Sequence, residues 1–382
     1  MNASKQAGQL NPEFNKGQPL EVDISIHLVR FTTEGGVLLL GDDSSGDYRL
    51  IKYDGTGKLD QAFNSGRPIE LGRILPSVEV DASGRILLAS RQDEKHITVQ
   101  RYKPDGILDA DFGEGGSTAI DLPVNGVSYR QVLELLLESR ALYLSGYVAL
   151  QGDIDVRVAI RVDESGKLDV GFAELGYKFS RNLVSPKYVV DEPGILAMGT
   201  RRDGIPDPYY LHVERYDGAG EVDRDFGNLG VWTKQWDEPG HDCLKDAGGT
   251  YKFLKYDASR QVMVILGITS DGKDDQTFGS AGRLEIPGLP GVWSWARSVG
   301  NERADYRFIH GSGMREDTPD KGVVKVCRTL RDGSPDDSFG TEGTVSLEYE
   351  TLNGKHGLAW TVNADGDIAV CVKGWLFWLL GR

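Results

Sequence analysis

The sequence is poor in the residues that build disulfide frameworks and metal sites. Its 382 residues include only three cysteines, Cys243, Cys327 and Cys371, which are far apart and form no CxxC pair. An odd number of scattered cysteines favours free thiols in a reducing compartment, so we expect a cytoplasmic protein. The six histidines never stand at HxH, HxxH or HExxH spacing, and we therefore expect no metal and no cofactor.

Long apolar runs and an excess of positive charge are also missing. The first twenty residues contain no apolar core of a signal peptide, and GWLFWLLG near the C-terminus is too short to span a bilayer. Lys and Arg number 43 against 58 Asp and Glu, so the net charge is −15. Such a surface repels nucleic acid and anionic membranes and favours a basic partner.

Local catalytic motifs are absent too. There is no G-x-S-x-G elbow, no phosphate-binding loop and no GxGxxG between a strand and a helix. Acidic turns such as DGKDD (271–275) lack the full ligand spacing of a calcium hand. These absences favour a non-enzymatic function.

What the sequence does contain is a repeated frame, seen most clearly in RYKPDGILDADFGEGG (101–116). Counting from Gly106, a basic residue stands at −5, Asp109 at +3 and Phe112 at +6. Seven copies occur, with steps of 49, 49, 60, 54, 52 and 61 residues between their phenylalanines. The glycines from which positions are counted are Gly8, Gly57, Gly106, Gly166, Gly220, Gly272 and Gly333. Periods in this range are typical of repeat architectures.

Each repeat has the pattern of four short strands joined by glycine-rich turns. In the second repeat the strands are predicted at 77–80, 85–90, 96–101 and 117–122, with the frame between the third and fourth. QVLELLLE (131–138) has an apolar pattern that also suits a helix, but the repeat register requires a strand there. The fifth repeat is degenerate, and we expect its third strand to be lost or displaced. The sequence thus predicts an all-β fold, a single seven-bladed β-propeller with four-stranded blades over residues 1–382.

The two ends of the chain complement each other. The C-terminus supplies three strands within 350–382 and then stops where the frame would begin, and residues 8–22 supply a frame and a fourth strand. We therefore expect the propeller to be closed by pairing of the N-terminal strand with the C-terminal blade, which removes two exposed sheet edges.

The frame RY-x-x-DG-x-LD-x-x-FG-x-GG closely resembles the delta-60 repeat of bacterial propeller-like proteins. The resemblance covers nearly the whole chain, is strongest in the second repeat and departs where Gly267 replaces the basic residue and Asn11 replaces Asp. It implies a fold and no single activity.

The candidate binding surface lies in loops that differ between repeats: 201–210, 235–249, 287–295, 311–322 and 349–356. In a four-stranded blade these loops all belong to one face, and variable loops on a rigid scaffold commonly carry function. Aromatic, arginine and neighbouring polar residues there are the candidate contacts. They are Arg202, Asp207, Tyr209, Trp236, His241, Trp293, Trp295 and His310.

The leading interpretation is a monomeric scaffold that binds a protein through the loops of blades four to seven, and the net charge of −15 favours a basic partner. Two alternatives come from other classes. A glycan-binding propeller would stack Trp and Tyr on sugar rings, although the tryptophans do not repeat from blade to blade. A propeller hydrolase or lyase would gather acids and histidines at the axis mouth.

Overall fold

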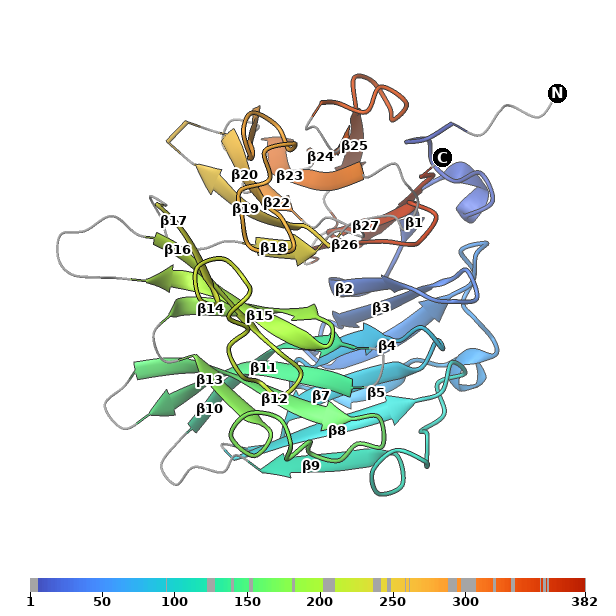
Figure 1. Cartoon of the computed structure of the whole chain (residues 1–382). Coiled ribbons are helices and arrows are strands. Elements are labelled where there is room, and N and C mark those ends of the chain that lie inside the picture. The colour runs from blue at the N-terminus through green and yellow to red at the C-terminus, as the bar shows by residue number, and fades with distance from the viewer. Residues whose placement is uncertain are drawn as a thin grey trace. The chain divides into compact units, whose positions relative to one another are not determined.

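In the computed structural model, the regular secondary structure of the described residues is almost entirely β-strand (Figure 1). It describes residues 6–93, 95–121, 128–138, 141–150, 154–180, 183–201, 210–235, 242–245, 249–257, 259–260, 262–287, 294–296, 307–318, 321–330, 334–350, 352, 355 and 357–381. Two short 3-10 turns, η1 (Asn15–Gly17) and η2 (Phe63–Gly66), accompany the strands.

The described strands form seven four-stranded antiparallel sheets. Four of them contain β2 (Ser25–Phe31), β3 (Val37–Asp42), β4 (Tyr48–Tyr53), β5 (Ile69–Gly72); β6 (Ser77–Val80), β7 (Ile86–Arg91), β8 (His96–Tyr102), β9 (Ser117–Asp121); β10 (Ser128–Leu137), β11 (Ala141–Leu150), β12 (Ile154–Asp163), β13 (Tyr177–Ser180); and β14 (Val184–Asp191), β15 (Gly194–Arg201), β16 (Tyr210–Tyr216), β17 (Val231–Gln235).

The other three complete the set. They contain β18 (Asp242–Lys245), β19 (Tyr251–Asp257), β20 (Val262–Ile268), β21 (Arg283–Pro287); β22 (Ser294–Ala296), β23 (Arg307–Thr318), β24 (Lys321–Leu330), β25 (Thr344–Glu350); and β1 (Leu20–Glu21) with β26 (Leu358–Val362), β27 (Ile368–Val372), β28 (Trp375–Leu379). The segment QVLELLLE belongs to strand β10, as the repeat register predicted.

The repeated frame forms the turn between the third and fourth strands, which we call the anchor turn. All seven of its phenylalanines are buried, with at most 2% of their surface exposed. In the second repeat, Arg101 Nε donates to Asp109 Oδ2 at 2.7 Å, and the guanidinium lies 4.7 Å from the Phe112 ring centroid. The apolar wedge and the ion pair therefore lock each turn onto its own sheet.

Anchor turns of successive repeats are also bonded to one another. Gly113 N donates to Ser165 O at 2.8 Å, and Ala173 N donates to Ala219 O at 2.7 Å. The arginine of one turn reaches the next as well, since Arg101 Nη1 donates to Glu164 O at 2.7 Å. The frame thus specifies both a turn and its contact with the following turn.

The N-terminal strand completes the C-terminal sheet, which confirms that part of the prediction (Figure 1). Leu20 of β1 pairs with Leu376 of β28, and Asn11 N donates to Trp378 O at 2.7 Å. The Phe14 ring lies 5.2 Å from the Trp378 ring centroid, so packing joins the two ends as well. Strand β28 is therefore covered on its outer edge.

The seven sheets divide between two compact units, which corrects the prediction of a single seven-bladed propeller. One unit comprises residues 1–61, 65–73 and 241–382, and the other 62–64 and 74–240. The first holds four sheets and the second three. The number of repeats predicts the number of sheets, because each sheet follows from residues close together in the sequence. The division of the sheets between two units depends instead on how one sheet packs on another. That residues 1–382 fold as one domain remains a prediction.

Two repeats differ from the predicted strand layout. In the fifth, no strand is lost: residues 242–245, expected in a loop, form the first strand β18, and the two strong segments that follow are the second and third. In the sixth, residues 311–322 were predicted as a loop, yet β23 continues to Thr318 and β24 starts at Lys321. Cross-strand pairing extends this hairpin although its sequence, rich in Gly and charge, has weak strand propensity.

Candidate functional site

The predicted binding side chains lie outside the part of the chain that the structure describes. Arg202, Asp207, Tyr209, Trp236, His241 and Trp293 lie outside the described residues. Trp295 belongs to β22 and His310 to β23, where Ala296 pairs with His310, but their side chains are likewise outside the described part. The polar groups described below therefore come from the described strands and turns of the sheets.

We call the end of a sheet that carries the turn between its second and third strands its loop end. At three loop ends, a cationic or imidazole side chain at the start of the third strand, or in the turn just before it, faces a carboxylate of the fourth. Arg49 Nε donates to Glu70 Oε2 at 2.9 Å, and His96 Nε2 lies 3.4 Å from Asp121 Oδ1. The third instance, Arg260 with Glu285, belongs to a larger cluster in the β18–β21 sheet.

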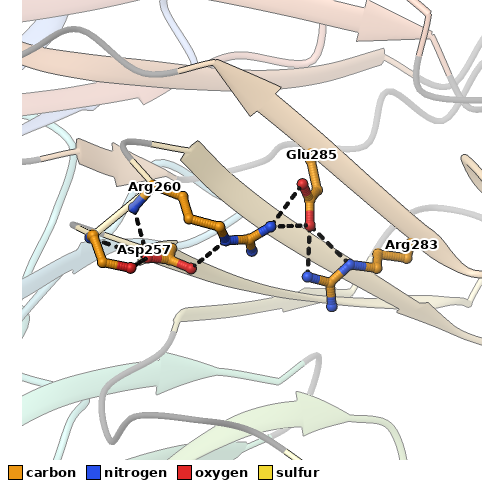
Figure 2. Close-up of polar contacts among 5 residues, drawn as sticks. Asp257, Arg260, Arg283 and Glu285 are labelled. Carbon is orange, nitrogen blue, oxygen red and sulfur yellow. Dashed lines mark hydrogen bonds and ion pairs between the residues drawn. The ribbon is translucent and has the colours of Figure 1, made fainter.

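This cluster, which we call the loop-end cluster, comprises Asp257, Ser259, Arg260, Arg283 and Glu285 (Figure 2). Arg260 Nε donates to Asp257 Oδ2 at 2.7 Å, and its Nη1 donates to both Glu285 oxygens at 3.0 and 3.1 Å. Arg283 Nη2 donates to Glu285 Oε1 at 2.6 Å. Two arginines are thereby held by two carboxylates in one continuous chain of ion pairs.

Local sequence explains how the cluster is positioned. Asp257 ends β19 and Ser259 and Arg260 follow it, so the carboxylate accepts from Ser259 Oγ at 2.6 Å and from the Arg260 backbone N at 3.1 Å, as in an Asx turn. Arg283 and Glu285 are two residues apart in β21, where alternate side chains share a face. The cluster lies beside Pro287, where the predicted loop 287–295 begins.

The electrostatics of the cluster favour permanent charge. Hydrogen bonds from Ser259 and then Arg260 hold the pKa of the Asp257 carboxyl well below its usual range. Hydrogen bonds from Arg283 and Arg260 lower the pKa of Glu285. A general acid or base needs a pKa near the working pH, so these carboxylates suit recognition better than proton transfer.

The loop end of the β2–β5 sheet carries a second polar group. A β-bulge between Ile26 and Leu28 places His27 Nε2 in hydrogen-bond contact with Asp42 Oδ1. The Tyr48 ring meets the imidazole edge-on at 5.4 Å between centroids. Burial and the Asp42 charge raise the pKa of the Tyr48 hydroxyl. Bulges commonly redirect a side chain, and here the result is an imidazole paired with a carboxylate and a phenol.

A third group is buried within the 74–240 unit, along one face of β16. His212 Nε2 lies 3.0 Å from Glu214 Oε1, and Tyr216 donates to the other Glu214 oxygen. Lys178 of β13 lies 4.0 Å from the Tyr216 ring centroid and donates to Gly220 O at 3.0 Å.

The pKa shifts in this group follow from burial and from hydrogen bonds. Burial acts to raise the pKa of Glu214, but hydrogen bonds from His212 and Tyr216 outweigh it and lower the pKa. Burial lowers the pKa of Lys178, although nearby glutamates oppose the shift. The contact of Lys178 in β13 with the Tyr216 ring in β16 joins two sheets, so we assign this group to the packing of the β10–β13 sheet on the β14–β17 sheet.

Metal ligands do not gather in the part of the chain that the structure describes: no group of three or more His, Cys, Asp or Glu side chains there could hold an ion. Within the same residues, no helix has the length and apolar character needed to cross a membrane. All three cysteines are free thiols, and burial raises the pKa of Cys327 and Cys371.

Sequence reasoning missed the loop-end cluster. Because residues 242–245 were expected in a loop, the strands on either side of the turn after Tyr256 were expected to be the first and second of the repeat, when they are the second and third. The available signal was Arg260 in DASR (257–260), where the turn DASG (81–84) has glycine.

Comparison with known proteins gives a fold and no family. No family model matches the sequence, and no curated protein shows significant similarity to it. Among solved structures, BBS1N in complex with ARL6DN matches with a TM-score of 0.50 at 11% identity, over 100% of this chain and 98% of that chain. The Nup133 β-propeller domain of Vanderwaltozyma polyspora matches with a TM-score of 0.45 at 12% identity, over 95% and 97% of the two chains.

The WD40 domain of SCAP from fission yeast matches with a TM-score of 0.44 at 10% identity, over 95% of this chain and 97% of that one. At such identities, likeness shows the fold alone. The class that emerges is the β-propeller class, with four-stranded antiparallel sheets as its blades.

Proposed function

We propose that this protein is a non-enzymatic scaffold that binds a protein partner through the loop ends of its fourth to seventh repeats. The observation that carries the proposal is the loop-end cluster, a set of charged side chains held in place beside the start of a variable loop. Side chains that are already ordered lose less conformational entropy on binding, so such a cluster is well suited to a recognition surface.

The chemistry of the cluster also indicates its partner. Its two arginines expose 48% and 44% of their side-chain surface while their carboxylate partners remain charged. The cluster thus presents positive and negative charges at fixed positions, which helps to orient a protein partner and to select it. A basic partner would match the net charge of −15.

Affinity capture from a lysate of the source organism tests the proposal. Wild-type bait is compared with Arg260→Glu, which reverses a central charge, and with Tyr209→Ala and Trp236→Ala in the variable loops 201–210 and 235–249. We expect each to reduce capture of the same partner, by more than about 2 kcal/mol where the residue is a hot spot, while the melting temperature stays the same.

The matched control is Ser83→Ala, in the turn between β6 and β7 at the opposite end of a sheet. Ser83 is exposed, and only its backbone N is used there, donating to Asp81 at 2.9 Å. Glu34 is unsuitable as a control because it pairs with the buried Lys52 at 2.7 Å. Capture that survives all three loop-end changes but is lost in Ser83→Ala contradicts the proposal.

The other interpretations of the sequence stay predictions. The glycan-binding alternative predicts retention on a glycan array that depends on Trp236 or Trp293. The hydrolase or lyase alternative predicts turnover that depends on acids and histidines gathered at the axis mouth. Delta-60 membership, a cytoplasmic location and a monomeric state are likewise retained as proposals, the last to be checked by light scattering.

A further inference from the structure

The anchor turns of the second to fourth repeats expose aliphatic side chains that the fold does not use. Four residues in the described part of the chain are large, apolar and more than half exposed: Ile107 (59%), Val170 (64%), Leu175 (69%) and Leu229 (72%). We call them the apolar tips. All four lie in the 74–240 unit, and all lie within residues 103–116, 163–176 and 217–230.

Two of the tips occupy a backbone position that disfavours leucine. Nine residues after the frame glycine, the chain has a positive φ in every repeat. Glycine stands there in the first three copies (Gly17, Gly66 and Gly115), and Ala281 and Glu342 stand there in the last two. Leu175 and Leu229 adopt φ values of 56° and 55°. A Cβ is strained in this region and an exposed leucine recovers nothing by packing, so folding alone gives no reason for these two residues.

Hydrogen bonds hold the three turns in one row. The second anchor turn is joined to the third through Gly113 N and Ser165 O at 2.8 Å, and the third to the fourth through Ala173 N and Ala219 O at 2.7 Å. Arg161 Nη1 adds a bond to Gly218 O at 3.1 Å. The apolar tips are therefore displayed on one rigid ridge of successive turns.

The charged side chains of the ridge are mostly acidic. Eight exposed carboxylates stand against three exposed cations, Lys103, Lys167 and Arg224. The carboxylates are Asp105, Asp111, Glu114, Glu164, Glu174, Asp217, Glu221 and Asp225. A ligand that covers the tips must lie among these negative charges.

We propose that residues 103–116, 163–176 and 217–230 form a docking surface for a basic segment of another protein that carries aliphatic side chains. The aliphatic groups cover the apolar tips, with Leu175 and Leu229 as the two equivalent contacts, and lysine or arginine side chains face the surrounding carboxylates. This surface is separate from the loop ends of the proposed function and stands without it.

Charge argues for this occupant over two others. A second copy of the chain would bring the same acidic ridge, or another part of a molecule with a net charge of −15, against it. An anionic lipid surface would be repelled for the same reason.

The experiment uses the full chain and a fluorescein-labelled amphipathic peptide of lysine and leucine, followed by fluorescence anisotropy. We expect saturable binding that weakens as salt is added. The double variant Leu175→Gly/Leu229→Gly should bind the peptide about tenfold or more weakly. Its melting temperature should be unchanged or higher, since glycine fits a positive φ, and this keeps loss of binding apart from loss of folding.

The matched control is Ala281→Gly/Glu342→Gly, which makes the same change at the same repeat position in the other unit and should leave the affinity unchanged. Equal binding by the Leu175→Gly/Leu229→Gly variant overturns the proposal, as does equal binding of a glutamate and leucine peptide. If the wild type self-associates and the leucine variant does not, the occupant is a second copy of the chain and the proposal is overturned. Capture by phosphatidylserine vesicles overturns it in favour of a membrane. Arg260→Glu leaves the ridge intact. Its effect on partner capture therefore tests the proposed function and not the ridge.

Discussion

The fifth repeat shows how a lost residue is replaced from the neighbouring strand. Gly267 stands where the other complete repeats have the basic residue of the anchor, and Lys252 of β19 pairs directly with it in register. Lys252 Nζ donates to Asp275 Oδ2 at 3.1 Å and lies 4.7 Å from the Phe278 ring centroid. A side chain on Gly267 would meet Phe278, so the glycine leaves room for the ring and the lysine supplies the charge.

At the residue scale we predict that Lys252→Met destabilises the protein by about 3–5 kcal/mol, because it leaves the buried Asp275 without its counter-charge. Lys252 has no exposed side-chain surface and Asp275 exposes 3%. The free energy of unfolding in urea measures the effect. The Lys252→Met/Asp275→Asn pair should recover part of the loss.

The control for this change is Lys273→Met. Lys273 pairs with Asp271 at 2.6 Å, but the two expose 75% and 50% of their side chains, so the loss should stay within about 0.5 kcal/mol. Equal losses at the two lysines would show that the buried pair does not support the anchor.

At the scale of elements, sheets in the 74–240 unit pack through polar as well as apolar side chains. Tyr188 of β14 is buried and its hydroxyl lies 2.7 Å from Ser180 Oγ of β13, so one sheet reaches into the other. Glu214 lies in the same interface between His212 and Tyr216. A partly buried carboxylate is tolerated there because His212 and Tyr216 hydrogen-bond to it.

This arrangement predicts a pH dependence. Glu214 has a pKa below its usual 4.5 in the folded state, so its charge contributes stability above pH 4.5 that is lost as pH falls through the folded pKa. Glu214→Gln should therefore cost about 1.5–3 kcal/mol at pH 7, and progressively less below pH 4.5. Urea unfolding across this range measures it.

Glu70→Gln is the control, because the Glu70 side chain is 60% exposed and pairs with Arg49 at the surface. It should change stability by less than about 1 kcal/mol. A loss at Glu214 that stays constant down to pH 3 would mean that its charge does not support the interface.

At the scale of the whole molecule, the chain ends are joined although they are far apart in sequence. Strand β1 borders β28, and Phe14 and Phe31 both contact the Trp378 ring, at 5.2 and 4.9 Å between centroids. The N-terminal anchor is thus part of the core of the 1–61, 65–73 and 241–382 unit.

Deletion of residues 1–22 should lower the melting temperature substantially and promote aggregation, because it uncovers the edge of β28 and empties the Phe14 site. Thermal unfolding followed by light scattering measures both. Deletion of residues 2–5, which retains β1 and Phe14, is the control. If the long deletion melts within a few degrees of the full chain, pairing of the termini does not stabilise the protein.

Much of the fold could be predicted because its signals are local and repeated. The frame glycine, the phenylalanine and the Arg–Asp pair lie within a dozen residues, so strands and anchor turns follow from short-range chemistry, such as the burial of Phe112 and the Arg101–Asp109 ion pair. The positions of the eight predicted binding residues could not be predicted in the same way, because the sequences of the variable loops do not repeat.

What the sequence by itself determined was therefore the all-β class, the seven copies of the anchor and the pairing of its two ends. Tertiary structure alone decided the division into two units, the replacement of an arginine by Lys252 and the chain of ion pairs through Arg260 and Glu285. The physical reason is the same in each case. Lys252 and Asp275 are 23 residues apart and Arg260 and Glu285 are 25 apart, so strand register and sheet packing bring them together only in the folded chain.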